Sequence, residues 1–290
     1  MPLLFTINRA DNDFFASADA GPDFFVARRV PYENNIGLAN IVKHSKLERL
    51  FYKAGDYTGQ HGFWAEFIEP TAICEGRSFL TLNTYDRARF TFGFAQFAAH
   101  VPDGDFVKFF RAMLGLAQAN AYFPHVFVKD GRIHRTGDGG SAVILETDKT
   151  TKPLMLYLNP TLGDVEDAEV IAAAKFIHWT STTVAARDLQ VAHMAATFMS
   201  LMRRAEKRIA MTDRPAAQCC VIADILHQGR GGAMTWALID AAVKSTKPLA
   251  ALLEIGSPKW DGRLKTLADA IVKNAAIQLK RWDAAAHDFV

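Results

Sequence analysis

The sequence predicts an α+β protein that is mainly helical, with a small lobe that contains a β-hairpin and a larger helical lobe. Hydrophobic residues make up 50% and charged residues 22% of the chain, which is the balance of a globular protein. Residues that favour strands gather between positions 79 and 158, whereas apolar residues at helical spacing dominate from Asp164 onward. Because no internal repeat or low-complexity linker divides the 290 residues, we expect a single domain over 1–290.

Turn signals separate the segments that favour strands. Gly93 interrupts the stretch Phe79–Phe97, and Asp130-Gly131 joins residues 126–128 to 132–134 as a hairpin. Residues 143–145 and 154–158 are predicted to add further strands. We therefore describe residues 121–160 as a β-rich insertion, and the stretch 121–215 matches no family pattern.

Apolar spacing predicts the helices. The helices expected from this spacing span residues 41–52, 103–120, 191–209, 218–228, 234–244, 248–254 and 263–280. The first 35 residues lack a periodic pattern and are predicted to be irregular. Residues 1–60 form an N-terminal extension of unknown role.

Composition excludes several classes of function. A formal net charge of +2 is too small to indicate a nucleic-acid partner. No stretch approaches the roughly 18 consecutive apolar residues that a membrane span needs. The first 15 residues lack the basic and apolar pattern of a secretory signal, and three cysteines make no disulfide framework, so synthesis in the cytoplasm is expected.

No metal or cofactor is predicted. The nine histidines include no His-Glu-x-x-His pattern, and the glycine-rich loops lack the lysine of a phosphate-binding loop. Cys74 could form a Cys-His hydrolase pair with His61 or His100, but no local signature of such an enzyme surrounds it. A small core residue is the preferred interpretation of Cys74.

A glutamate, an aspartate and a threonine follow one another on a short stretch. Glu75 precedes Gly76 at the end of a predicted helix, Asp86 lies in a predicted turn, and Thr91 lies on a predicted strand. Glycoside hydrolysis needs one carboxylic acid to protonate the leaving oxygen and a second carboxylate near water. From chemistry alone a structural pair of acids is the preferred interpretation of this spacing, because such pairs are common.

This stretch resembles the catalytic segment of phage-type lysozymes, in which Glu-Gly is followed by Tyr and Asp on a turn and then by an aromatic-Thr-apolar-Gly strand. The resemblance covers residues 75–96. It implies a lysozyme-like two-lobed fold and an inverting mechanism in which Glu75 is the acid and Asp86 and Thr91 position the attacking water. The segment is also similar to chitosanases, but these favour an Arg-Gly pair where this chain has Ala88-Arg89.

Three further residues are candidates for substrate binding. Residues 217–271 resemble the helices of phage-type lysozymes in which a glutamine borders the cleft, and this resemblance implies that Gln228 binds substrate. Gln96 stands where several bacterial transglycosylases carry a glutamine that lines the cleft; a structural position fits it equally well. Tyr85 could stack on a sugar or be buried beside Asp86.

The leading hypothesis is a peptidoglycan-cleaving muramidase that acts on the cell wall after phage lysis or delivery by a secretion system. Two alternatives stay open: a chitosanase-like hydrolase of amino-sugar polymers, and a lysozyme-like module that binds glycan or builds a structure without cutting. The presence of Glu75, Asp86 and Thr91 together favours an enzyme. The sequence gives no indication of an oligomeric state.

Overall fold

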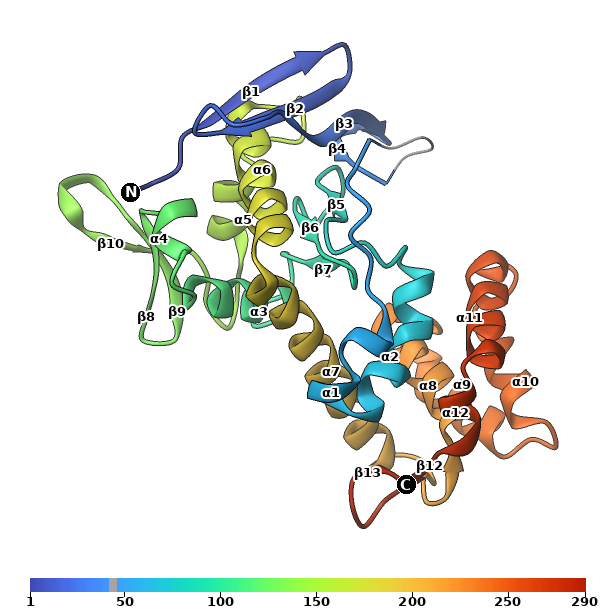
Figure 1. Cartoon of the computed structure of the whole chain (residues 1–290). Helices are drawn as coiled ribbons and strands as arrows, with labels where there is room; N and C mark the ends of the chain where they lie inside the picture. Colours follow the sequence, from blue (N-terminus) through green and yellow to red (C-terminus); the bar gives the residue numbers. More distant parts are fainter. Residues whose placement is uncertain (42–45) are drawn as a thin grey trace. The chain divides into compact units, whose positions relative to one another are not determined.

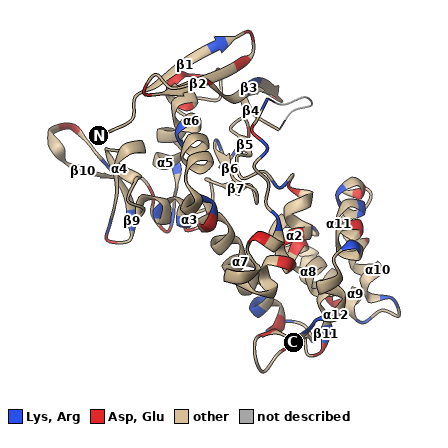
Figure 2. Ribbon diagram, viewed as in Figure 1, with Lys and Arg blue, Asp and Glu red and all other residues tan. Residues whose placement is uncertain are grey.

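The computed structural model describes residues 1–41 and 46–290 and shows an α+β protein (Figure 1). The chain divides into two compact units. Unit 1 comprises Met1–Phe51 and Ser78–His193, and unit 2 comprises Tyr52–Arg77 and Met194–Val290. No helix among the described residues has both the length and the apolar character needed to cross a membrane. Acidic and basic residues occur along both units, in keeping with the small net charge (Figure 2).

A seven-stranded antiparallel sheet forms the centre of unit 1. Its strands lie in sequence order, and each pairs with the next along the chain. They are β1 (Phe5–Ala10), β2 (Asp13–Ala18), β3 (Phe24–Tyr32), β4 (Asn35–Ala39), β5 (Leu82–Asn83), β6 (Thr91–Phe92) and β7 (Phe97–Ala98).

The prediction that the first 35 residues are irregular is wrong. These residues form β1, β2, β3 and the start of β4. Most of β1 is exposed at the edge of the sheet, and four of the six residues of β2 are buried. Neither strand therefore shows the simple alternation of apolar and polar residues by which a half-buried strand is recognised.

The predicted helix over residues 41–52 is wrong where the structure describes it. Residues 42–45 lie outside the described part of the chain, and residues 46–52 contain no helix. The carbonyl of Leu50 accepts a hydrogen bond from the Phe79 amide at 3.0 Å, and Phe51 forms a β-bridge with Ser78. The backbone polar groups of residues 50 and 51 are therefore paired with the segment that precedes β5 and do not form helical hydrogen bonds.

Residues 103–160 form two helical segments, a β-meander and a further helix. The meander contains β8 (Val126–Lys129), β9 (Arg132–Thr136) and β10 (Ala142–Ile144), which confirms the predicted hairpin and the predicted strand at 143–145. The helix predicted over 103–120 ends early: α3 (Asp105–Leu114) stops before Gly115, and α4 (Ala119–Tyr122) follows. The strand predicted at 154–158 is wrong, because Pro153 opens the helix α5 (Lys152–Leu158).

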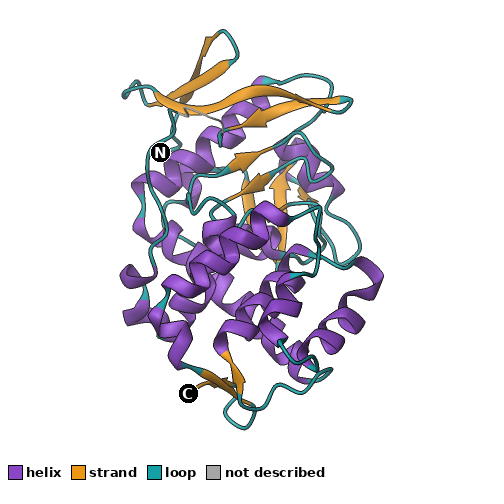
Figure 3. Ribbon diagram, turned by 90° about the vertical axis from the view of Figure 1, so that its right-hand side faces the viewer, coloured by secondary structure: helices purple, strands orange, loops and turns teal. Residues whose placement is uncertain are grey.

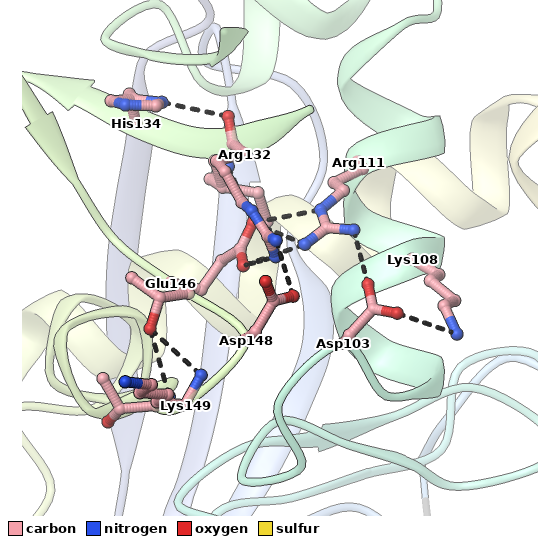
Figure 4. A network of polar contacts seen from close by, with 11 residues as sticks. Asp103, Lys108, Arg111, Arg132, His134, Glu146, Asp148 and Lys149 are labelled. Atoms are coloured by element: carbon pink, nitrogen blue, oxygen red, sulfur yellow. Dashed lines mark hydrogen bonds and ion pairs between the residues drawn. The ribbon is translucent and has the colours of Figure 1, made fainter. Parts of the chain in front are cut away.

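A buried carboxylate ties the meander to α3. Glu146 is 1% exposed and accepts hydrogen bonds from Nε and Nη2 of Arg111 at 3.0 and 2.8 Å (Figure 4). Its Oε1 also accepts the backbone amide of Ile133 at 2.9 Å, and Nη1 of Arg132 lies 3.4 Å from its Oε2. The two arginines and the amide compensate for the desolvation of this carboxylate, which fixes the position of the meander.

The core of unit 1 lies under the sheet. Helix α6 (Asp167–Thr182) packs against β1, β2 and β3, as Figure 1 shows. Phe176 on this helix is fully buried and lies at the centre of an aromatic cluster. Its ring centroid is 5.0–5.7 Å from those of Phe90, Phe92, Phe106, Phe110 and Phe123.

Unit 2 is mostly helical (Figure 3). Its elements are η1 (Ala54–Asp56), α1 (Thr58–His61), α2 (Phe63–Cys74), β11 (Arg214–Pro215), α8 (Ala216–Gln228), η3 (Gly232–Met234), α9 (Thr235–Val243), α10 (Pro248–Leu253), α11 (Asp261–Lys273), α12 (Ala275–Leu279), β12 (Arg281–Asp283) and β13 (Asp288–Phe289). The long helix α7 (Val184–Glu206) belongs to unit 1 up to His193 and to unit 2 beyond it.

The helices predicted for this part of the chain are confirmed, with a break at Asn274 that divides the last into α11 and α12. Helix α2 also ends where the Glu75-Gly76 signal predicts: Glu75 is its C-cap and Gly76 has a φ of 86°. The core of unit 2 contains Phe67, whose ring contacts those of Phe198 and Phe289. The three-stranded sheet of β11, β12 and β13 was not predicted from the sequence.

Candidate functional site

Unit 1 brings together Tyr85, Asp86 and Thr91 on the segment that connects β5 to β6. Asp86 is half-buried in a turn, and its Oδ1 accepts the amide of Ala88 at 2.8 Å. Thr91 begins β6, is 4% exposed, and pairs with Asn83 and with Ala98 in the sheet. The local structure therefore has the turn and the strand that the sequence predicts for Asp86 and Thr91.

Two buried side chains from distant segments, Asn159 and Glu169, hold this turn. Asn159 is fully buried, and its Nδ2 donates to the carbonyls of Thr84 and Arg89 at 3.0 and 3.1 Å. The Thr84 hydroxyl donates to Glu169 on α6 and accepts the amide of Leu38 at 2.6 Å. Both ends of the segment that carries Tyr85 and Asp86 are thus hydrogen-bonded to the interior of unit 1.

The surroundings of Glu169 on α6 change the pKa of its carboxyl group strongly. Its side chain is fully buried, and this burial raises the pKa of the carboxyl to about 7, although the hydrogen bond from Thr84 acts in the opposite direction. The rise follows from the cost of an ionised carboxylate in an apolar environment. Glu169 therefore keeps its proton between about pH 4.5 and about pH 7, where an ordinary glutamate is ionised.

Gln96 lies in the turn between β6 and β7. Its φ is 50°, and its amide donates to the carbonyl of Gly93 at 2.9 Å. The interior of this turn is held by Gln190 on α7, which accepts the amide of Phe94 and donates to the carbonyl of Phe79, both at 3.1 Å. Gly93 has a φ of 90°, and a Cβ there would lie 2.5 Å from Oε1 of Gln190, so the position favours glycine.

Glu75 lies in unit 2, at the end of α2. Its side chain is 13% exposed, and its Oε1 accepts a hydrogen bond from Nη1 of Arg263 at 2.5 Å. Arg263 comes from the first turn of α11. Helix α2 therefore sets the position of the Glu75 backbone, and α11 supplies the cation that orients its carboxyl group.

The same guanidinium also binds Asp224 in the middle of α8. Nη2 of Arg263 donates to Oδ1 at 2.7 Å, and Nε lies 3.4 Å from Oδ2. Arg230, whose side chain is fully buried, donates to Oδ2 of Asp224 and, at 2.8 Å, to Oε1 of Gln228. Burial alone would raise the pKa of Asp224, but Arg263 and Arg230 hold it below its ordinary value.

The six residues predicted from the sequence thus fall into two groups. Unit 2 connects Glu75 to Gln228 through a continuous network of three buried charged residues, Arg263, Asp224 and Arg230. Unit 1 contains Tyr85, Asp86, Thr91 and Gln96 on the strands and turns of its sheet.

Sequence analysis did not identify the network of buried charges. One signal was present in the sequence: Asp224 interrupts the apolar run Val221–Leu226, and a charged residue inside such a run is expected to be paired. Nothing in the sequence pattern indicates that its partner is Arg263, because the two lie on different helices.

The surroundings of Cys74, next to Glu75, do not favour a nucleophilic thiolate. Burial raises the pKa of its thiol to about 12, and its Sγ lies 3.7 Å from the carbonyl of Arg263. A thiol with this pKa contains almost no thiolate at neutral pH. All three cysteines are free, and the described residues contain no cluster of three or more His, Cys, Asp or Glu that could hold a metal ion.

The structure is that of an α+β protein. The carboxyl group of Glu75 lies at a helix end in unit 2, and that of Asp86 lies on a turn in unit 1. Comparisons with protein-family models, with curated proteins and with solved structures found no match.

Proposed function

We propose that the protein is a lysozyme-like glycoside hydrolase that cleaves the β-1,4 glycan of peptidoglycan by inversion. Glu75 is the general acid, and Asp86 and Thr91 position the attacking water. The observation that carries this proposal is the local structure of the segment 75–92, in which a helix ends at Glu75, a turn carries Asp86 and a strand begins with Thr91. In this proposal, units 1 and 2 are the two lobes of a lysozyme-like fold. The expectation of a small β-containing lobe and a larger helical lobe is wrong in the sizes, because unit 1, which contains the seven-stranded sheet, is the larger unit.

The two carboxyl groups have different hydrogen-bond partners. Glu75 is largely shielded from solvent, and a shielded carboxyl group has its rotamer fixed by its hydrogen-bond partner, here Arg263. Asp86 is half-buried in a turn, and the Ala88 amide donates to its Oδ1 at 2.8 Å. An inverting glycosidase needs a proton donor of fixed orientation and a second carboxylate near water, and the proposal assigns these tasks to Glu75 and Asp86.

Zymography on purified sacculi beside chitosan tests the proposal, with the wild type and the Glu75→Gln and Asp86→Asn variants in parallel. We expect clearing of sacculi by the wild type and none by either variant. Clearing of chitosan alone would favour the chitosanase-like alternative. Binding to sacculi without clearing by the wild type would indicate a non-catalytic module and would contradict the proposal.

A further inference from the structure

A partly exposed pair of tyrosines lies beside Asp86. Tyr32 ends strand β3, and Tyr85 precedes Asp86 on the turn between β5 and β6. Their ring centroids are 4.9 Å apart and their planes are inclined by 34°. Tyr32 is 46% exposed and Tyr85 is half-buried, so the pair presents aromatic surface to solvent.

This pair differs from the tyrosines that pack the core. Tyr52 and Tyr57 in unit 2 also form a ring pair, with centroids 5.5 Å apart, but they are only 0% and 8% exposed. Packing explains Tyr52 and Tyr57 completely, because almost all of their surface is removed from water. It does not explain why about half of the Tyr32 surface stays in water.

The chain is built to hold Tyr32 against Tyr85. Tyr32 pairs with Asn35 at the tip of the β3–β4 hairpin. Strand β4 then passes so close to the second tyrosine that a Cβ on Gly37 would lie 2.8 Å from its Cα and backbone nitrogen. The carbonyl of Leu38 accepts the amide of Thr84 at 3.0 Å, which joins β4 to the residue before Tyr85. The hairpin and the turn are therefore closely packed and hydrogen-bonded to each other.

The surroundings of the pair are polar. Glu33 and Asn34 at the hairpin tip are exposed, and Arg87 is exposed after Asp86. Burial raises the pKa of the Tyr85 hydroxyl, and Asp86 and Tyr32 add to this rise through their charges. Tyrosine combines an apolar ring with a hydroxyl group, which suits the alternation of C–H faces and hydroxyl groups on a pyranose.

We propose that Tyr32 and Tyr85 form an aromatic platform that binds the C–H face of one pyranose ring of an amino-sugar glycan next to Asp86. This inference rests on the proposed function for its substrate class. It assigns to the N-terminal extension a direct part in substrate binding: the extension supplies Tyr32 and fixes the orientation of Tyr85. Both tyrosines are binding residues, and neither takes part in proton transfer.

Calorimetric titration with a peptidoglycan tetrasaccharide and with an N-acetylglucosamine tetramer tests the platform. The background is Glu75→Gln, in which the glycan is not turned over under the proposed function. We expect Tyr32→Ala to raise the Kd about 5- to 10-fold and Tyr32→Phe to change it less than 2-fold, because the phenyl ring keeps the stacking surface. Trp260→Ala is the matched control, since Trp260 is a 37% exposed aromatic residue of unit 2, and it should leave the Kd unchanged.

The platform is contradicted if Tyr32→Ala binds both glycans as tightly as its parent, if Trp260→Ala weakens binding equally, or if the parent binds neither glycan. In the otherwise wild-type chain, Tyr32→Ala should raise KM with kcat preserved. If Tyr32→Ala weakens binding but the wild type cleaves no glycan, the platform stands and the proposed hydrolase activity fails. The two failures are therefore distinguishable.

Discussion

The guanidinium of Arg263 binds Oε1 of Glu75 at 2.5 Å and Oδ1 of Asp224 at 2.7 Å. One arginine on α11 thus connects the end of α2 to the middle of α8. Asp224 is fully buried and the side chain of Arg263 is 11% exposed, so this contact is shielded from salt and solvent. The carboxyl group proposed as the acid therefore has an orientation set by three helices of unit 2.

Removal of the central arginine should destabilise the protein strongly. Arg263→Met leaves Asp224 buried with one cation fewer, and loss of one partner of a buried pair typically costs about 3–5 kcal/mol. We expect a loss of about 3 kcal/mol in the free energy of unfolding, measured by urea titration. The control is Arg281→Met, whose exposed ion pair with Asp213 contributes under about 1 kcal/mol. Equal losses in the two variants would contradict the assigned importance of the buried network.

The pKa of Glu169 predicts a pH dependence of stability. The folded state holds a proton on this carboxyl up to a pH of about 7, whereas an unfolded glutamate releases it near its ordinary pKa of about 4.3. The folded state therefore binds more protons between these values, and its stability falls as the pH rises from about 4.5 to about 7. The contribution of this group to stability is complete below that window and absent above it.

The Glu169→Gln variant isolates this effect because its amide does not titrate. Relative to the variant, the wild type should lose about 3 kcal/mol of unfolding free energy across the window, from denaturant titrations at each pH. Parallel pH profiles for the two proteins would show that Glu169 does not titrate as proposed.

Asn159 should be needed to order the turn that carries Asp86. Asn159→Ala removes the donors to the carbonyls of Thr84 and Arg89, and each buried carbonyl left without a partner costs about 1–3 kcal/mol. We expect faster amide hydrogen exchange at residues 84–90. Asn274→Ala, which removes the side-chain cap of α12, is the control and should leave exchange in that segment unchanged. Unchanged exchange in Asn159→Ala would exclude a role for Asn159 in holding the turn.

The sequence predicted the elements that have strong periodicity or turn signals. The amphipathic helix α3, the Asp130-Gly131 hairpin and the end of α2 at Glu75 all follow from local chemistry. Strands β1 and β2 escaped prediction because their burial depends on α6, which lies more than a hundred residues away in the chain. Arg263 and Asn159 were missed for the same reason, since each makes its contacts with segments distant in sequence.

The proposed inverting mechanism predicts the anomer of the first product. A water positioned by Asp86 and Thr91 attacks the face of the sugar opposite to the leaving group, so a β-linked glycan should release the α-anomer first. Proton NMR during the first turnovers distinguishes the two anomers before they equilibrate. Initial appearance of the β-anomer would remove Asp86 and Thr91 from their proposed tasks.

The turnover of Glu75→Gln on purified sacculi tests the central proposal most directly. The amide keeps the size of the side chain and can still accept the hydrogen bond of Arg263, but it has no proton to transfer to the leaving oxygen. Glu254→Gln, an exposed acid on the surface of unit 2, serves as the control and should retain full turnover. We predict a loss of roughly 10²–10⁴ in turnover for Glu75→Gln, with an unchanged circular dichroism spectrum. Turnover close to that of the wild type would contradict the assignment of Glu75 as the acid.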